Sequence, residues 1–450
     1  MSVDPSTAAA LTQRLAVEQS THRLPSVVAG IVRDGELVWH GAAGTLDGRA
    51  GGEAPTADTQ YRIGSISKTF IAVEVLRLRD EGLLDLADTI RTHLPEAPFG
   101  HVTIVQLLTH TSGMQAETDG DWWERSPGGD WSSLLASGVH LRSTPGTTFH
   151  YSNVGYGVLG ELVARLRGVP WHDAVRDGIL VPLGMTRTTT RPVAPAAPGL
   201  AVHPLADLLH VEPEHDAGAM APAGQLWSTV GDLSRWATFL AGHTGDVLSR
   251  ATVTEMLRPV AINDVPGSPW GGAHALGWQM WNVGGRRFAG HGGSMPGFLA
   301  GLRVDVSSGD GVVLMTNATS GLGTATTDLL DLFRERQPVA PAPWHADATQ
   351  ADGLDLAGPW SWGTQTLTLV LQADGGFRLG EPGLGRGARF RRDGDGWVGL
   401  ESYYRDEPLR VERDGSGRPL RLVLASFVFT RTPYDPAAEI PGGIDPAGWH

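Results

Sequence analysis

Apolar residues recur along this chain with two different spacings. Residues 27–32 and 36–42 are apolar-rich extended segments on either side of Asp34-Gly35, a dipeptide that favours a tight turn, so a β-hairpin is predicted there. Before this hairpin, residues 6–19 carry an amphipathic helical pattern. After it, apolar residues at helical spacing begin at Ile66 and stop before Gly82, a residue type that commonly ends helices.

The middle of the chain is predicted to be mainly helix and loop. Helical spacing predicts helices over 154–166 and 228–241, separated by a long irregular excursion over 191–225. The segments that follow are predicted as four strands and a closing helix: 275–281, 286–289, 298–306, 311–316 and 326–336. Strands at both ends with helices between them fit an antiparallel sheet built from both chain ends with a helical insertion, an α+β fold.

A second domain is predicted after a Pro-rich linker at residues 337–343. There the pattern changes to six short strands divided by Asp-Gly and Gly turns: 367–371, 377–380, 388–392, 397–403, 409–413 and 420–430. Short strands at this spacing predict a small antiparallel barrel or sandwich. The expected domains are therefore residues 1–340 and 350–450.

Charge and composition exclude several functions. The formal net charge of −14 over 450 residues argues against binding to nucleic acid or to an anionic membrane. No apolar run approaches membrane-spanning length and no signal peptide is visible, so a cytoplasmic protein is expected. The absence of cysteine excludes disulfides and thiolate metal sites, and His203, His210 and His215 do not have metal-ligand spacing. No metal or cofactor is expected.

Lys68 is the only lysine in the protein. Lys and Arg together number 35, so the other 34 basic residues are arginines, which cannot give up their proton. Lys68 follows Ser65 by three residues at the start of a predicted helix, where the two side chains can meet. The pattern predicts a deprotonatable amine beside a hydroxyl. The alternative is a helix-capping serine with an exposed lysine.

Two further groups of residues are candidates for chemistry. Tyr151 and Asn153 precede a predicted helix, and His291-Gly292-Gly293-Ser294 lies on a strand where small residues allow a substrate to approach the backbone. A buried tyrosine beside a lysine can exist as a phenolate or act as a proton shuttle. Taken singly, each group also has a structural interpretation: Tyr151 as core, His291 as a buried polar residue and the glycines as a turn.

Together and in this order, the motifs resemble the serine β-lactamase and penicillin-binding-protein superfamily. The match runs from about residue 20 to residue 335 and is most similar to the branch with class C β-lactamases, D-Ala-D-Ala carboxypeptidases, D-aminopeptidases and esterases. The sequence motifs that carry the resemblance are Gly64-Ser65-Ile66-Ser67-Lys68, Leu107-Leu108-Thr109-His110-Thr111-Ser112-Gly113, Tyr151-x-Asn153 and Gly290-His291-Gly292-Gly293. True β-lactamases carry lysine where this chain has His291, which favours a peptidase, esterase or acyltransferase.

The resemblance implies roles for these residues. Ser65 attacks an acyl carbonyl, and Lys68 and Tyr151 exchange the proton. The backbone N–H groups of Ser65 and Ser294 form the oxyanion hole, beside Gly292 and Gly293. Two further roles are implied for side chains that touch the substrate: Asn153 holds its amide, and His291 orients the site or contacts the carboxyl end.

The expected acyl donor follows from the lack of an export signal, which argues against cell-wall carboxypeptidase activity. Penicillin-binding-protein-type thioesterases resemble this chain in layout, with a catalytic domain followed by a lipocalin-like β domain. Such enzymes release nonribosomal peptides with a D-configured C-terminal residue from a peptidyl carrier protein, by hydrolysis or cyclisation. A cytoplasmic D-aminopeptidase or esterase, and a catalytically silent peptide- or β-lactam-binding protein, are the alternatives.

Overall fold

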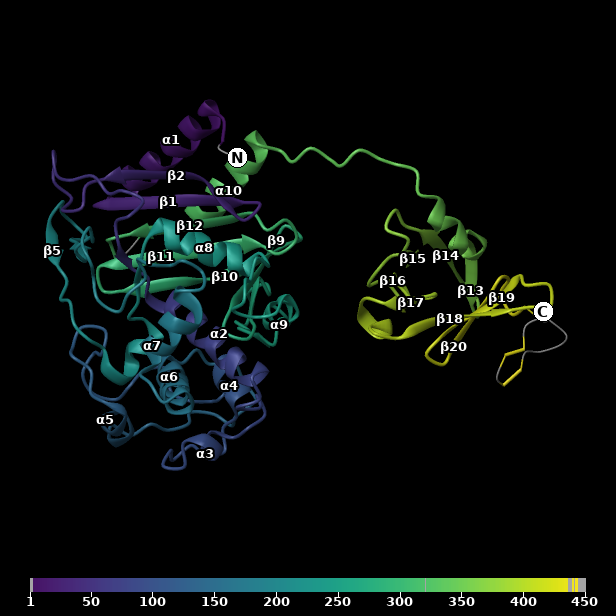
Figure 1. The fold of residues 1–450 in the computed structure, drawn as a ribbon, viewed down its shortest axis with the longest axis horizontal. Helices are drawn as coiled ribbons and strands as arrows, with labels where there is room; N and C mark the ends of the chain where they lie inside the picture. The colour runs from purple at the N-terminus through teal and green to yellow at the C-terminus, as the bar shows by residue number, and fades with distance from the viewer. Residues whose placement is uncertain (1–2, 320, 436–438, 441, 444–450) are drawn as a thin grey trace. The chain divides into compact units, whose positions relative to one another are not determined.

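The chain forms two compact units. The computed structural model describes residues 3–319, 321–435, 439–440 and 442–443, and contacts divide the chain at residue 339 into an N-terminal and a C-terminal unit. The N-terminal unit contains a large sheet with helices on both faces, and the C-terminal unit is a β-barrel (Figure 1).

The predicted hairpin is confirmed and forms one edge of the sheet. Strands β1 (Ser26–Arg33) and β2 (Glu36–Gly44) pair antiparallel. The turn residues Asp34 and Gly35 have φ angles of 53° and 78°, the left-handed values that match the twist of a two-residue hairpin.

The sheet is built from both ends of the unit, as predicted. It has eight antiparallel strands, and its order brings the N-terminal β1 beside β12 near the end of the unit. The strands in spatial order are β2, β1, β12 (Gly311–Thr316), β11 (Phe298–Asp305), β10 (Arg286–Met295), β9 (Gln279–Val283), β8 (Gly272–His274) and β7 (Ala261–Ile262).

Alternation along β1 separates two hydrophobic cores. Val27, Ala29 and Ile31 pack with α1 (Pro5–Thr21) and α10 (Ala325–Arg336) on one face of the sheet. Val28 and Val32 belong to the larger core on the other face, where α8 (Val230–Leu240) lies on the strands and the helical part of the unit follows (Figure 1).

The predicted helical insertion forms most of the helical part of this unit. Its helices are α2 (Ser67–Asp80), α3 (Ile90–His93), α4 (Ile104–Leu108), α5 (Trp131–Ala136), α6 (Asn153–Arg167), α7 (Trp171–Val175) and α9 (Arg250–Met256), with the short helical turns η1 (Gly64–Ile66), η2 (Arg176–Leu180) and η3 (Gly218–Ala223). Two small strand pairs complete it: β3 (Tyr61–Arg62) with β6 (Trp227–Ser228), and β4 (Leu200–Val202) with β5 (Leu209–Val211).

The single strand predicted over residues 275–281 is wrong. The chain turns at Gly277, with φ at 82°, between β8 and β9. A Cβ at this position would lie 2.1 Å from the Cβ of Ala72, so the glycine lets the turn touch α2. By contrast, β10 continues well beyond the predicted residue 289, because its glycines pair with β11.

The C-terminal unit is a closed antiparallel barrel with its own hydrophobic core. Three details differ from the six predicted strands. The strand predicted over 397–403 ends at Gly399, and a 3₁₀ turn follows at Ser402–Tyr404. The first barrel strand was not predicted, and residues 420–430 form two strands because Ala425 adopts a left-handed turn with φ at 52°. After η4 (Ala348–Leu356), the strands are β13 (Gly358–Trp362), β14 (Gln365–Leu371), β15 (Phe377–Leu379), β16 (Ala388–Asp393), β17 (Gly396–Gly399), β18 (Pro408–Arg413), β19 (Pro419–Leu424) and β20 (Phe427–Thr430), with η5 (Ser402–Tyr404) before β18.

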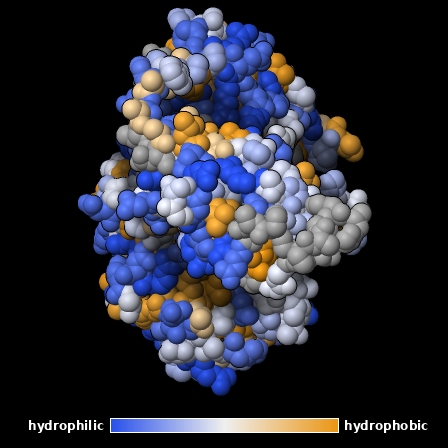
Figure 2. Space-filling model, turned by 90° about the vertical axis from the view of Figure 1, so that its right-hand side faces the viewer, coloured by the Kyte–Doolittle hydropathy of each residue, from blue (hydrophilic) through white to orange (hydrophobic). Residues whose placement is uncertain are grey.

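The exposed residues are mostly hydrophilic in the view of Figure 2. Figure 2 shows hydrophilic residues over most of one face, with hydrophobic residues in small scattered groups. Among the described residues, every helix is too short or too polar to cross a membrane.

Candidate active site

Ser65 lies in a tight turn between β3 and α2. The turn η1 follows β3, and Gly64 takes a left-handed φ of 52°, so the chain reverses before α2 begins at Ser67. Ser65 therefore precedes the α-helix in a 3₁₀ turn, rather than starting the helix itself. The predicted contact is present: Nζ of Lys68 lies 2.9 Å from Oγ of Ser65.

The Lys68 ammonium is fully buried. Its Nζ also donates to the carbonyl of Ala223 at 2.7 Å. Burial lowers the pKa of Lys68 to about 7, although the carboxylates of Glu117 and Glu124 favour its charged form. The alternative of an exposed lysine is wrong. At neutral pH a large fraction of Lys68 is an uncharged amine in contact with a hydroxyl, which is the condition for a general base.

Tyr151 lies on the other side of the lysine, just before α6. Nζ of Lys68 is 5.1 Å from the centre of the Tyr151 ring. Burial raises the pKa of Tyr151 above its ordinary value, and a hydrogen bond with Ser65 opposes this only in part. The Tyr151 side chain is therefore a protonated phenol. Of the two predicted forms, the phenolate is disfavoured and the proton shuttle is compatible with the site.

His110 supports Tyr151, a contact that the sequence did not reveal. The two rings stack with centroids 4.1 Å apart and planes 25° apart. Nδ1 of His110 also accepts a hydrogen bond from the backbone N–H of Ser152 at 3.1 Å. His110 was part of the quoted Thr-His-Thr-Ser-Gly phrase, but nothing in that phrase indicated which residue it would contact.

Asn153 presents an unused acceptor. Its Nδ2 donates to Glu117 at 2.6 Å, and Glu117 is also held by Nε1 of Trp123 at 2.6 Å. With the amide oriented in this way, Oδ1 of Asn153 is buried and lacks a hydrogen-bond partner among the described residues. A substrate N–H would satisfy it.

His291 is buried on β10 beside the same centre. Its Nδ1 lies 2.5 Å from the carbonyl of Gly292, so Nδ1 carries the proton and Nε2 is left as an acceptor. Burial, together with the charge of Lys68, lowers the pKa of His291 to about 3. The imidazole is neutral at physiological pH. It therefore supplies no charge where β-lactamases have lysine.

Two glycines bring the Ser65 turn against β10. A Cβ on Gly293 would lie 1.9 Å from the carbonyl oxygen of Ile63 and 3.3 Å from the backbone N of Ser65. A Cβ on Gly64 would lie 2.5 Å from the backbone N of Ser294. Only glycine at both positions allows this approach, which places the N–H groups of Ser65 and Ser294 close together. Two such donors can stabilise an oxyanion.

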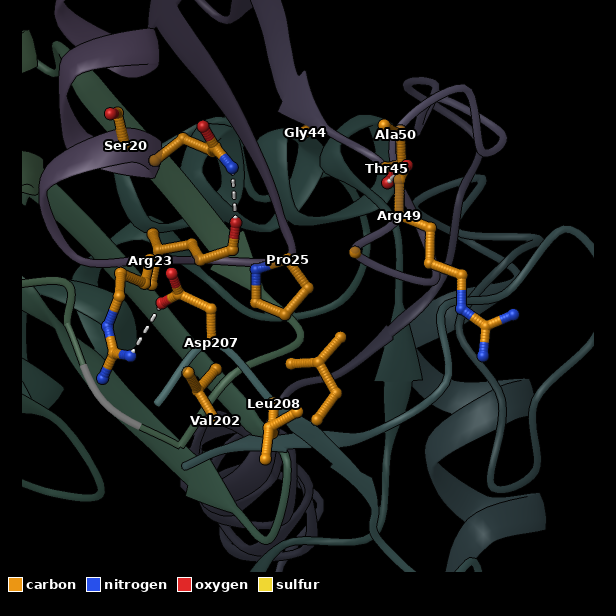
Figure 3. Close-up of a pocket in the computed structure, with 14 residues that line it drawn as sticks. Ser20, Arg23, Pro25, Gly44, Thr45, Arg49, Ala50, Val202, Asp207 and Leu208 are labelled. Atoms are coloured by element: carbon orange, nitrogen blue, oxygen red, sulfur yellow. Dashed lines mark hydrogen bonds and ion pairs between the residues drawn. The ribbon is translucent and has the colours of Figure 1, made fainter. Parts of the chain in front are cut away.

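A cavity elsewhere in the unit is not lined by these residues. It has a volume of about 660 Å³ and lies between the end of α1, the loop after β2 and the β4–β5 hairpin (Figure 3). Arg23 and Asp207 form an ion pair in its wall. The candidate site is thus identified by its converging chemical groups and not by cavity size.

Fold and motifs together define a penicillin-binding-protein-like serine hydrolase. The chain belongs to the beta-lactamase family, whose model matches residues 8–334. Residues 349–431 match a domain of unknown function, DUF7586.

Three known proteins are similar to this chain. Penicillin-binding protein 4 of Amycolatopsis lactamdurans is 30% identical over 384 residues, which span 77% of this chain and 96% of that protein. The crystal structure of a D-stereospecific amidohydrolase from Streptomyces sp. is 27% identical with a TM-score of 0.60, covering 74% of this chain and 99% of that one. The crystal structure of SurE, at 23% identity and a TM-score of 0.59, shares the fold over 96% of this chain and 100% of that chain.

Proposed function

We propose that this chain is a serine hydrolase or acyltransferase with Ser65, Lys68 and Tyr151 as its catalytic centre. The observation that carries the proposal is the 2.9 Å contact between Nζ of Lys68 and Oγ of Ser65, at a lysine whose pKa is lowered to about 7. This pairing produces an activated nucleophile without a histidine base.

The reaction is a two-step acyl transfer. Neutral Lys68 takes the proton of Ser65 as Oγ bonds to the acyl carbonyl carbon, and the N–H groups of Ser65 and Ser294 hold the oxyanion. The bond to the leaving group breaks, and the proton reaches that group through the Tyr151 phenol. Water or an amine then attacks the acyl-enzyme, and Ser65 recovers its proton.

The charges around the centre favour a neutral leaving group. His291 is uncharged, and the ionic groups that act on both Lys68 and Tyr151 are the carboxylates of Glu117 and Glu124. Carboxylates repel a carboxylate-bearing substrate and attract an amine. An amide, ester or thioester whose leaving group carries no carboxylate therefore suits the site better than a penicillin or an acyl-D-Ala-D-Ala, which both carry one.

Among such donors, the proposed substrate is a nonribosomal peptide with a D-configured C-terminal residue, carried as a thioester on a peptidyl carrier protein. Release occurs by hydrolysis or by attack of the peptide's own amine, which closes a ring. A thioester releases an uncharged thiol, the acidic site attracts an amine, and Oδ1 of Asn153, which has no partner among the described residues, suits a peptide N–H. The D configuration is supported by similarity to a D-stereospecific amidohydrolase.

A D-aminopeptidase or amidase is the second candidate. It is favoured by Glu117, which is exposed, is held by Asn153 and acts on Lys68, so it can receive a free α-amino group near the reacting carbonyl. An esterase of the same family uses the same centre. A silent binding protein is disfavoured because the Ser65–Lys68 contact is intact.

Incubation with a peptidyl thioester ending in a D residue tests the proposal. We expect thiol release together with a cyclic or linear peptide, identified by mass spectrometry, and much slower turnover of the L-terminal isomer. Turnover of D-aminoacyl amides without thioester turnover would support the second candidate instead.

The Ser65→Ala variant is the matched control. We expect it to lose activity by a factor on the order of 10³ or more, with an unchanged circular dichroism spectrum and melting temperature. A fluorophosphonate should label the wild type at Ser65 and leave the variant unlabelled. Persisting activity in the variant would contradict the assigned nucleophile.

A further inference from the structure

The pairing between β9 and β10 stops short of the candidate oxyanion hole. The last paired residues are Gln279 and Gly290, so beyond that point this edge of β10 pairs with no strand among the described residues. Beyond this point a side chain takes the place of the missing backbone partner: Oε1 of Gln279 accepts a hydrogen bond from the backbone N–H of Gly292 at 3.0 Å.

This bond fixes which end of the Gln279 amide faces away from β10. A backbone N–H only donates, so the oxygen must point to Gly292 and the NH₂ must point elsewhere. The NH₂ has no hydrogen-bond partner among the residues that the structure describes. Gly292 itself is exposed, and a Cβ there would meet only Oε1 of Gln279, at 3.8 Å, so the space beside the amide is open.

Gln279 lies near the residues that serve the leaving group, and the residue that is proposed to bind the acyl group belongs to a different element. Its strand partner on β8 is His274, whose ring lies 6.0 Å from the Tyr151 ring. Tyr151 is the residue proposed to pass the proton to the leaving group. The free acceptor assigned to the acyl part, Oδ1 of Asn153, belongs to α6 instead.

The two imidazoles of this region are neutral. Burial lowers the pKa of His274 to about 4, and His291 is also uncharged. A neutral amide donor beside neutral imidazoles suits an uncharged carbonyl oxygen, because neither imidazole offers a positive charge to a carboxylate that loses its hydration.

We propose that Gln279 and Gly292 form a leaving-group subsite in which the Gln279 NH₂ donates to an amide carbonyl of the departing thiol. The inference rests on the proposed acyl transfer at Ser65. The chemical class is a thiol whose chain carries an amide a few atoms from sulfur, as in the pantetheine arm of carrier proteins. The acyl–sulfur bond breaks, the Ser65 ester forms, and the thiol leaves with the proton from Ser65.

Two D-phenylalanyl thioesters that differ only in the thiol test this assignment. One carries N-acetylcysteamine, which has the amide, and the other carries an unbranched alkyl thiol of equal length. The protein has no cysteine, so any thiol detected comes from the substrate. We expect the full-length wild type to acylate with a kcat/KM about five- to tenfold higher for the amide-bearing thioester, the effect of one hydrogen bond.

Two variants of Gln279 distinguish its hydrogen bond with Gly292 from its proposed hydrogen bond with the amide of the thiol. Gln279→Glu keeps an acceptor for Gly292 but loses the NH₂, so it should lose the preference between the two thioesters. Gln279→Leu loses both bonds and should be slower on both thioesters, with no preference. Asn282→Leu, an exposed change on the same strand, should behave as the wild type.

The outcomes distinguish this inference from the proposed function. If the wild type acylates both thioesters equally, or if both Gln279 variants keep the preference, the subsite assignment is overturned while the acyl transfer stands. If neither thioester acylates Ser65, the proposed function and the inference fall together. Loss of the preference in both variants, with Asn282→Leu unchanged, supports the subsite.

Discussion

At the residue scale, two opposing effects act on the Lys68 ammonium. The rings of Tyr151 and Tyr156, centred 5.1 and 5.7 Å from Nζ, favour the cation, as do Glu117 and Glu124. A cation–π contact contributes on the order of 0.5–2 kcal/mol to holding the cation. Desolvation is the larger effect, because the pKa falls from 10.5 to about 7.

The acylation rate should therefore depend on pH through Lys68. The base is active when uncharged, and its pKa is about 7, so kcat/KM should rise as pH increases through 7 and level off above about pH 8. Initial rates between pH 5 and 9 measure this. Lys68→Arg, which stays protonated throughout, should be inactive and show no such rise. A flat wild-type profile across this range would contradict the role of Lys68 as the base.

At the scale of elements, the site depends on how closely the η1 turn approaches β10. The turn between β3 and α2 contributes Ser65 and its N–H, and β10 contributes Ser294 across the gap. Gly64 and Gly293 set this distance, since a side chain on either one would meet backbone atoms of the opposite segment. Backbone atoms cannot rotate away from such a contact as a flexible side chain can.

Gly293→Ala should push the η1 turn and β10 apart. The added methyl would meet the Ile63 carbonyl at 1.9 Å, so the strand or the turn must move, and one oxyanion donor is lost. We expect kcat to fall by roughly a hundredfold or more. Steady-state kinetics measure this, and thermal unfolding shows whether the protein still folds. Gly271→Ala, whose Cβ would have open space around it, is the control and should retain wild-type kinetics.

At the scale of the whole molecule, the chain contains separate hydrophobic cores. The two clusters that flank the large sheet lie within the N-terminal unit, and the barrel cluster runs from Leu356 to Phe429 in the C-terminal unit. All the candidate catalytic residues belong to the N-terminal unit. Each unit thus contains the apolar contacts that its own fold requires.

The two units should therefore unfold independently. Calorimetry of the full chain should show two transitions, and a shortened chain of residues 1–339 should keep one of them. This shortened chain should also still be labelled at Ser65 by a fluorophosphonate. A single cooperative transition in the full chain, or loss of the folded state on shortening, would show that the units depend on each other.

Much of the fold follows from local sequence patterns. Asp34-Gly35 predicted the hairpin because few dipeptides adopt its turn, and Ser65 and Lys68 are three residues apart, so their contact needs only one helical turn. The Gly277 turn was missed. Its glycine is needed because α2 lies against it, and such a contact has no local sequence pattern.

The sequence by itself determined which residue types meet at the site, because motif order and one unique lysine are properties of the chain. Only the tertiary structure decided their states and supporting contacts. The neutral fraction of Lys68, the protonated Tyr151 and the uncharged His291 depend on burial, which arises when distant segments pack together. The contacts of His110 with Tyr151 and of Gln279 with Gly292 likewise join residues whose partners no local pattern specifies.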